Sequence, residues 1–159
     1  MNEKSYSTVA RCKTAWENYK ILMLLHKIRR TGVKNHGICI SPLYLADQNV
    51  QEHSYLVATL AVMMYAMFEE IQEYFPPHYV ETLLLHDIGE TKIGDIADDG
   101  SADAVIHKDE EEYVFLSDFV NDFAPEIRDD IMANFSQFQK KHDILYMIDK
   151  LEWILFVAY

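Results

Sequence analysis

The stretch "LLLHDIGETKIGDI", Leu83 to Ile96, places a histidine and an aspartate directly behind three leucines. The leucines predict a helix over about 80–88, and an ionised carboxylate on its apolar face loses hydration that the protein must replace. His86 and Asp87 lie about 100° apart on a helical wheel, so their side chains can converge on one point. Taken alone, the pair is explained equally well as two metal ligands or as a helix end bonded to a neighbouring loop.

Two other polar residues also lie on apolar helix faces. His53 shares a helical stripe with Leu56 and Leu60, although a single inward histidine is usually a core residue with a satisfied hydrogen bond. Asp149 lies within "ILYMIDKLEWILF", the most hydrophobic helix that the sequence predicts. An inward aspartate in such a place is ordinarily paired with a basic side chain, bonded to a helix end or bound to a metal.

A single divalent metal ion would account for all of these residues. The four predicted ligands are His53, His86, Asp87 and Asp149. Two neutral imidazoles and two carboxylates suit one transition-metal ion such as Mn, Co, Fe, Ni or Zn, and they leave coordination positions open for water. The ion replaces the hydration that the carboxylates lose. It also lowers the pKa of a bound water, which supplies a nucleophile near neutral pH.

Two further carboxylates follow the histidine–aspartate pair. Glu90 lies one helical turn after His86, and Asp95 follows in the tight sequence "IGDIADD". If a metal is bound nearby, either carboxylate could move a proton to or from the reacting group without being a ligand. Before any family comparison, ordinary helix-end and loop acids explain these two residues equally well.

The composition favours helices. Half of the 159 residues are apolar and 13% are aromatic, whereas only five glycines and four prolines interrupt them. A chain of this length predicts a single domain over residues 1–159. We therefore expect an all-α bundle of about six helices, with a long loop over 33–50 and a second loop over 89–103 that contains one short helical turn. The helices are predicted at about 14–30, 51–74, 80–88, 103–122, 125–140 and from 142 onward. The last one is still apolar and uncapped at Tyr159, which leaves open whether it continues beyond this residue.

The net charge of −12 disfavours binding of duplex nucleic acid, because that affinity depends on neutralising phosphates. A small phosphorylated substrate needs only a local positive site, and five basic residues lie within one fifteen-residue stretch. They are Lys20, Lys27, Arg29, Arg30 and Lys34. On charge alone, a solvated helix face is the favoured explanation of this cluster.

The compartment is predicted from the cysteines and the apolar runs. Cys12 and Cys39 form no CxxC motif and the N-terminus lacks an apolar signal region, so we expect a cytoplasmic protein. The uncharged run Ser54–Phe68 is shorter than the roughly 20 residues that a membrane span needs, so we expect no membrane partner. The apolar last helix would favour a homodimer if one of its faces is exposed. Motifs for dinucleotides, P-loop phosphates, HExxH zinc sites and serine nucleophiles are absent from the sequence.

The pattern His53…His86-Asp87…Asp149 resembles the H…HD…D signature of the HD-domain metal-dependent phosphohydrolases. Three stretches carry the resemblance, namely "NVQEHSYLVATLAVMM", "LLLHDIGETKIGDI" and "MIDKLEWIL". Together, "RRTG", "QEHS" and "HDIGETKIGDI" resemble the 5′-deoxynucleotidase branch in particular. That branch uses a divalent metal to remove phosphate from deoxyribonucleoside 5′-monophosphates, so the resemblance implies a mononucleotide substrate.

The resemblance also implies a role for each candidate residue. It gives the metal to the four ligands above, catalysis and substrate organisation to Glu90 and Asp95, and contact with the phosphate to Arg30. The chain departs from the branch at Val33, where a tryptophan is frequent, in "NFSQFQ", where the branch has a tryptophan-rich acidic stretch, and in the loop 34–47. These departures bear on substrate identity more than on metal chemistry.

Two other functions stay open. Another HD hydrolase would act on nucleoside triphosphates, alarmones or cyclic nucleotides. A site for polyphosphates is expected to contain more basic residues, and the sequence shows only one basic cluster. A helical module could instead bind a metal or nucleotide without turnover. The full set of ligands together with Glu90 and Asp95 argues against this module, because a degenerate copy would be expected to lose some of them.

Overall fold

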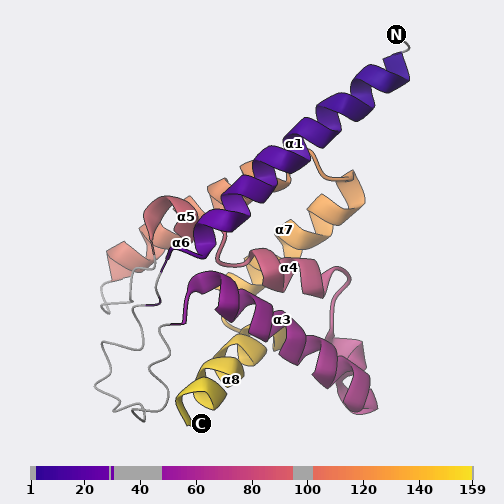
Figure 1. The fold of residues 1–159 in the computed structure, drawn as a ribbon. Helices are drawn as coiled ribbons and strands as arrows, with labels where there is room; N and C mark the ends of the chain where they lie inside the picture. Colours follow the sequence, from indigo (N-terminus) through magenta and orange to yellow (C-terminus); the bar gives the residue numbers. More distant parts are fainter. Residues whose placement is uncertain (1–2, 29, 31–47, 95–101, 159) are drawn as a thin grey trace.

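The structure is a computed structural model that describes residues 3–28, 30, 48–94 and 102–158 (Figure 1). Within these ranges it contains helices and no β-strand element, which confirms the expected all-α fold. The helices are α1 (Glu3–Leu25), α3 (Val50–Met67), α4 (Tyr79–Leu85), α5 (Glu90–Ile93), α6 (Ala102–Val120), α7 (Pro125–Gln139) and α8 (Ile144–Ala158), with the 3-10 helix η1 (Glu69–Tyr74). Each predicted helix is present, and α5 is a short helical turn within the loop predicted over 89–103.

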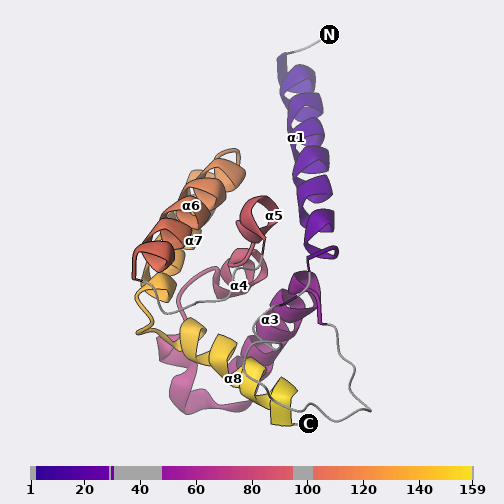
Figure 2. The same ribbon diagram turned by 90° about the vertical axis from the view of Figure 1, so that its left-hand side faces the viewer.

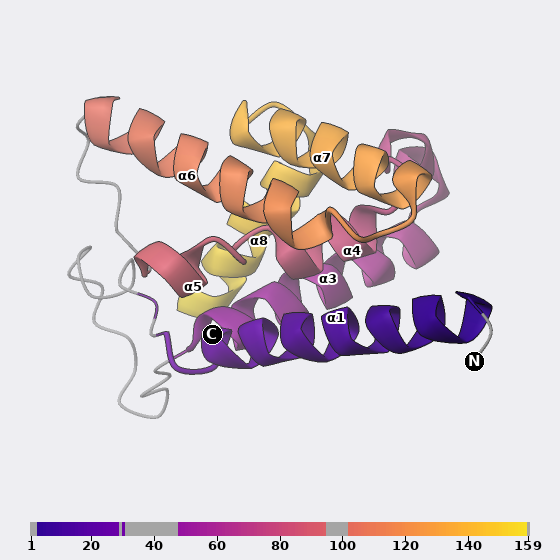
Figure 3. The ribbon, with the colours of Figure 1, turned by 90° about the horizontal axis from the view of Figure 1, so that it is seen from above.

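Helix α3 packs against both α4 and α8, while α4 also contacts α7. Figures 2 and 3 show α4 and α5 between α1 on one side and the pair α6 and α7 on the other. In the view of Figure 2, α8 crosses below α3 and α4. The beginning of α1 extends beyond the rest of the fold (Figures 1 and 2). The helices α3, α4 and α8, which carry the predicted ligands or lead into them, are therefore neighbours in space.

Two groups of buried apolar side chains form the core. The first group joins α1, α6 and α7 to the chain around α4 and consists of Leu25, Val50, Leu85, Ile88, Leu116, Phe119, Val120, Ile131 and Phe135. The second group joins α3, α4 and α8 and consists of Val57, Ala58, Ala61, Leu83, Ile144, Leu145 and Ile148.

The chain around α4 belongs to both groups. Leu83 is a member of the second group, whereas Leu85 and Ile88 are members of the first. Side chains two residues apart on a helix point in nearly opposite directions, which is why neighbouring leucines reach different cores. His86 and Asp87 therefore lie in a segment that is anchored on both sides.

A capping box fixes the beginning of α3. The side-chain oxygen of Asn49 accepts the backbone N–H of Glu52 at 2.9 Å, and the Glu52 carboxylate accepts the backbone N–H of Asn49 at 3.1 Å. These two bonds satisfy donors that a helix N-terminus otherwise leaves unpaired. His53 follows directly, so its position in the first turn of α3 is well determined.

Helix α1 differs from its predicted range at both ends. It begins at Glu3, whereas the predicted start is near residue 14. The prediction starts too late because the first turns of the helix are too polar to show an apolar stripe. It ends at Leu25, before Arg30, because the backbone that follows pairs with the segment leading into α3. Arg30 donates its N–H to the carbonyl of Gln48 at 3.2 Å, and the carbonyl of Ile28 accepts the N–H of Val50 at 3.0 Å.

The helix predicted over 51–74 is divided into α3 and η1. Phe68 between them has extended backbone angles, with φ −125° and ψ 94°. The side chain of Gln72 then folds back and donates to the carbonyl of Tyr65 at 2.8 Å. Glutamates at 69, 70 and 73 follow α3, and negative charge at a helix C-terminus opposes the helix dipole, so continuing the α-helix here is unfavourable.

Helix α8 begins at Ile144, close to its predicted start. The carboxylate of Asp143 accepts the backbone N–H of Tyr146 at 2.8 Å and so caps the first turn. One side of the helix packs into the second core group, while Met147, Ile154 and Leu155 are exposed. Among the described helices, none combines the length and the apolar character that crossing a bilayer would require.

Leu83 and Leu84 provide a matched test of this arrangement. Leu83 has no exposed surface, whereas 40% of Leu84 is exposed. We expect Leu83→Ala to lower the free energy of unfolding by about 2–5 kcal/mol, because it leaves a cavity in the second core group. Leu84→Ala should cost about 1 kcal/mol or less. Urea unfolding of both variants measures the difference, and equal losses would contradict the assigned orientation of α4.

Candidate metal centre

His53 lies in the first turn of α3 and its side chain is fully buried. Its Nδ1 atom lies 2.8 Å from Oε2 of Glu152 on α8. Its other nitrogen, Nε2, lies 2.9 Å from Oδ1 of Asp149 and 3.7 Å from Oδ2 of Asp87. Although it approaches these oxygens closely, Nε2 makes no hydrogen bond to any described residue with the geometry that an N–H donor needs.

His86 is the C-cap residue of α4 and is also buried. Its Nδ1 atom lies 2.7 Å from the carbonyl of Leu83 in the preceding turn. Its Nε2 atom lies 3.3 Å from Oδ2 of Asp87 and 3.8 Å from Oδ1 of Asp149, and it too has no hydrogen-bond partner among the described residues. The ring of Phe138 packs edge-on against the imidazole at 5.2 Å and helps to fix its plane.

Asp149 reaches the same point from α8 and is only 4% exposed. Its Oδ1 atom faces the two imidazoles, while its Oδ2 atom pairs with Lys150 at 2.7 Å. Burial by itself raises the pKa of this carboxyl, but the imidazoles of His53 and His86 and the ammonium of Lys150 hold it well below its usual range. Asp149 is therefore ionised at neutral pH.

The charges of the cluster favour a cation at its centre. Burial lowers the pKa of His86, but the carboxylates of Asp87 and Asp149 more than offset this effect and raise the pKa to about 9. Burial raises the pKa of the Asp87 carboxyl, but the imidazoles of His86 and His53 and the guanidinium of Arg30 outweigh this effect, so the pKa is lowered overall. The buried carboxylate of Asp149 and the partly buried carboxylate of Asp87 thus need positive charge between them, which a proton on the imidazole or a divalent ion can provide.

The donor set fits a divalent transition metal. Nitrogen and oxygen atoms of His53, His86 and Asp87 form a group whose ligand atoms all lie within 4.8 Å of one another. The Nδ1 atom of each imidazole has a hydrogen-bond acceptor, whereas neither Nε2 atom makes a hydrogen bond to a described residue. Each ring therefore carries its proton on Nδ1 when neutral and directs the lone pair of Nε2 into the cluster. Asp149 is not part of that group, but its Oδ1 atom lies 2.9 Å from Nε2 of His53 and 3.8 Å from Nε2 of His86. Imidazole and carboxylate ligands suit Mn, Fe, Co, Ni or Zn.

Glu152 was not among the residues predicted for the site. It is 5% exposed, and both of its carboxylate oxygens are engaged, because Gln48 donates its side-chain N–H to Oε1 at 2.9 Å while Oε2 faces His53. One signal was present in the sequence: Glu152 follows Asp149 by three residues on a strongly apolar helix, so the two acids share a face.

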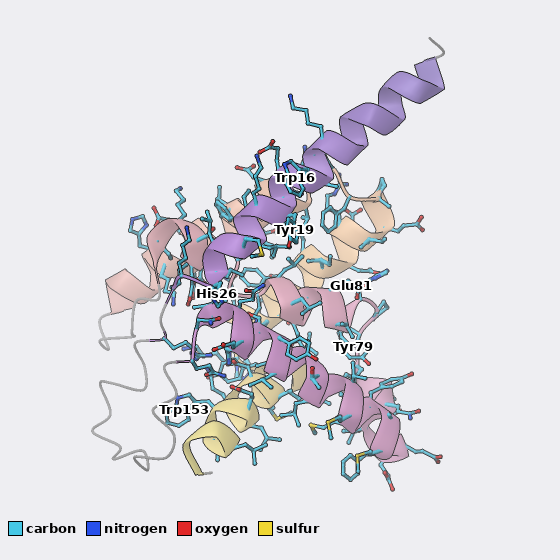
Figure 4. All side chains as sticks on the ribbon, in the orientation of Figure 1. Trp16, Tyr19, His26, Tyr79, Glu81 and Trp153 are labelled. Carbon is cyan, nitrogen blue, oxygen red and sulfur yellow. The ribbon has the colours of Figure 1, made fainter. Side chains whose placement is uncertain are left out.

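Arg30 lies close enough to Asp87 for its guanidinium to lower the pKa of that carboxyl. Its Nη1 atom is buried and has no hydrogen-bond partner among the described residues. The backbone bond between Arg30 and Gln48 holds this position beside the beginning of α3. Figure 4 shows His26, where α1 ends, beside the same segment, and its Nδ1 atom lies 3.2 Å from the side-chain amide of Asn49.

Glu90 begins α5 and is 4% exposed. Lys108 from α6 lies 3.6 Å from its Oε1 atom and 3.5 Å from Oε1 of Glu112, so one ammonium joins two carboxylates. Gly89 allows α6 to approach, because a Cβ atom there would lie 2.8 Å from Cγ and 2.9 Å from Cα of Glu112. The other predicted carboxylate, Asp95, lies outside the described residues.

Glu112 should make the stability of the fold depend on pH. Burial, together with the charges of Asp87 and Asp109, raises its pKa from 4.5 to about 7 despite the opposing effect of Lys108. The folded protein therefore holds a proton that the unfolded chain releases, and the resulting stability is complete below pH 4.5 and lost as pH rises through about 7. Glu112→Gln cannot titrate, so its stability relative to the parent protein should increase across this range.

Urea unfolding of metal-free protein at several pH values in this range measures the effect. Glu110→Gln, at an exposed position of the same helix, is the control. A constant difference between Glu112→Gln and the parent protein across the range would contradict the raised pKa.

Removal of a ligand should remove the metal while the fold remains. We expect Asp149→Asn and His86→Ala each to weaken binding of Mn²⁺ or Co²⁺ by roughly 10- to 100-fold or more. Loss of a residue that only hydrogen-bonds a metal ligand already costs that much affinity. The matched controls are His107→Ala and Asp118→Asn, at exposed positions of α6. Isothermal titration calorimetry gives the affinities and circular dichroism the helical content. Wild-type affinity in either ligand variant would show that the ligand is misassigned.

Comparisons with known proteins identify the family. Residues 24–158 match the family described as the HD domain. The solved structure of a conserved hypothetical protein from Pyrococcus furiosus has a similar fold, with a TM-score of 0.58 and 22% sequence identity over 87% of this chain and 74% of that chain. A search of curated proteins gave no significant match. The chain belongs to the HD domain family, whose members bind divalent metals and are generally hydrolases.

Proposed function

We propose that this protein is a metal-dependent phosphohydrolase that releases phosphate from (deoxy)ribonucleoside 5′-monophosphates. The observation that carries the proposal is the pair of buried Nε2 atoms of His53 and His86, which face two carboxylates and make no hydrogen bond within the described structure. The resemblance of "RRTG", "QEHS" and "HDIGETKIGDI" to the 5′-deoxynucleotidase branch directs the proposal to mononucleotides.

The four proposed ligands are His53, His86, Asp87 and Asp149. These residues would hold a divalent ion, which would supply Lewis-acid polarisation of the phosphoryl group and a better water nucleophile near neutral pH. The burial of three of these side chains, with Asp87 only partly exposed, keeps bulk water from competing for the ligand atoms. The ligand atoms come from α3, the turn after α4, and α8, so their spacing is set by helix packing.

Arg30 is the proposed phosphate-binding residue. Its buried Nη1 atom offers a donor, and the position of Arg30 beside Asp87 brings positive charge to the edge of the metal cluster. A guanidinium can bind two phosphoryl oxygens at once and offset the charge that builds on them in the transition state. The local positive charge suits a small anion although the net charge of the chain is −12.

Glu90 is proposed to move the proton, with Asp95 as the second functional carboxylate. In the reaction, the water oxygen bonds to phosphorus while the bond between phosphorus and the 5′-oxygen breaks. Glu90 accepts a proton from the water and passes a proton to the departing 5′-oxygen, which leaves as a hydroxyl, so Glu90 returns to its starting state and one water is consumed for each phosphate released. The ammonium of Lys108 lies 3.6 Å from Oε1 of Glu90 and helps to position this carboxylate for proton transfer.

A phosphate-release assay tests the proposal. We expect metal-stripped protein to be inactive and activity to return with Mn²⁺ or Co²⁺ on a panel of nucleoside 5′-monophosphates. Glu90→Gln should keep the metal and lose about 10²-fold or more in kcat, because general acid–base catalysis typically contributes that much. Glu110→Gln, an exposed glutamate on α6, is the matched control.

The same panel includes nucleoside triphosphates, an alarmone and cyclic nucleotides. Turnover of one of these in preference to monophosphates would replace the proposed substrate with another HD chemistry. Tight metal binding without phosphate release from any nucleotide would instead support a binding module. Full activity of Glu90→Gln would remove Glu90 from the mechanism.

A further inference from the structure

The two imidazoles of the metal centre are held in different ways. His86 faces the carbonyl of Leu83 in its own helix, so its orientation depends on backbone that forms locally. His53 instead faces the carboxylate of Glu152, which comes from a different helix and lies 99 residues away in the sequence. The orientation of His53 therefore depends on a side chain that a single substitution can remove.

Glu152 is itself held in place. The side-chain amide of Gln48 donates to Oε1 at 2.9 Å, which leaves Oε2 directed at Nδ1 of His53 at 2.8 Å. All three side chains are buried, with exposed fractions of 5% or less, so water cannot substitute for either contact. Gln48 in turn is fixed because it precedes the capping box of α3 and its carbonyl accepts the N–H of Arg30.

The chemistry of this contact determines which ring nitrogen of His53 is available. Both ring nitrogens face carboxylate oxygens, which only accept hydrogen bonds, but only Nδ1 has the geometry of an N–H donor. The proton of the neutral imidazole therefore lies on Nδ1, and Nε2 directs its lone pair toward the point between Asp149 and Asp87. The carboxylate also makes the imidazole a better electron donor to a metal. Without Glu152, the proton is free to occupy Nε2, and the ring is free to turn.

We propose that Glu152 is a positioning residue that fixes His53 with its proton on Nδ1, and that Gln48 supports the metal site by orienting Glu152. The inference deepens the proposed metal site and does not depend on the identity of the substrate. The two acids of α8 then have different roles. Asp149 faces the proposed metal position, whereas Glu152, three residues later, faces the far side of the His53 ring.

Metal affinity tests the role of Glu152 directly. We expect Glu152→Leu to weaken binding of Mn²⁺ and Co²⁺ by about 10- to 100-fold, and Glu152→Gln, which keeps an acceptor oxygen, to weaken it less. Glu73→Gln removes the same charge at an exposed position of η1 and should leave the affinity unchanged. Thermal unfolding in the presence of chelator verifies that each variant is folded. Wild-type affinity in Glu152→Leu would overturn the proposal.

The protonation of the ring provides a second readout that a merely structural role would not change. With ¹⁵N-labelled histidine and Zn²⁺ as a diamagnetic probe, NMR of the wild-type protein should show His53 protonated at Nδ1 and coordinated through Nε2. Glu152→Gln, the conservative variant, should retain this pattern in part. Coordination through Nδ1 in the wild type, or an unchanged signal in Glu152→Leu, would contradict the assigned role.

Gln48 is tested by a double-mutant cycle. Gln48→Leu should weaken metal binding less than Glu152→Leu does, and it should add little to the loss in the double variant, because it acts through Glu152. Losses that add fully would show that Gln48 acts by another route. These measurements need no turnover. An inactive protein with the expected affinities would therefore refute the proposed hydrolase and leave this inference intact.

Discussion

The fold is organised around one cluster, in which the buried carboxylate of Asp149 and the partly buried carboxylate of Asp87 meet the buried imidazoles of His53 and His86. Asp87 and Asp149 lose hydration in this place, and their mutual repulsion has to be offset by positive charge. The raised pKa of His86, about 9, expresses the same need in protein without a metal. We propose that a divalent ion bound by all four side chains would satisfy this need more completely than a proton does. We therefore regard the cluster as built for a cation.

The helices are arranged to hold this cluster rigid. Leu83 and Leu85 place the turn after α4 between two core groups, and the capping box of Asn49 and Glu52 fixes the turn of α3 that carries His53. On α8, the side that carries Asp149 and Glu152 faces inward next to Leu145 and Ile148. Because these contacts come from close-packed cores, a small shift in one helix would separate the ligands. This rigidity is what a metal site needs in order to select geometry.

Much of the site was predictable because its residues violate local patterns. An aspartate among leucines, as at Asp87, and one on the apolar face that holds Asp149 are costly unless they have a partner, so the sequence alone pointed to them. Helix α7 likewise begins at Pro125, as expected from the fixed backbone of proline.

Contacts between distant segments were not predictable in this way. The pairing of Gln48 with Glu152 spans 104 residues, and Lys108 reaches Glu90 from another helix. No local periodicity encodes either contact. The sequence also did not predict that α3 ends at Met67, because the exact end of a helix is poorly determined by local sequence preferences.

The central claim is that one ion lies between these four side chains. Crystals grown with Zn²⁺ and measured on both sides of the zinc absorption edge test it most directly. We expect one anomalous peak within about 2.0–2.2 Å of the Nε2 atoms of His53 and His86 and of a carboxylate oxygen from each of Asp87 and Asp149. An ion bound elsewhere, an ion bonded to Nδ1 of either histidine, or no ion at this point would contradict the account.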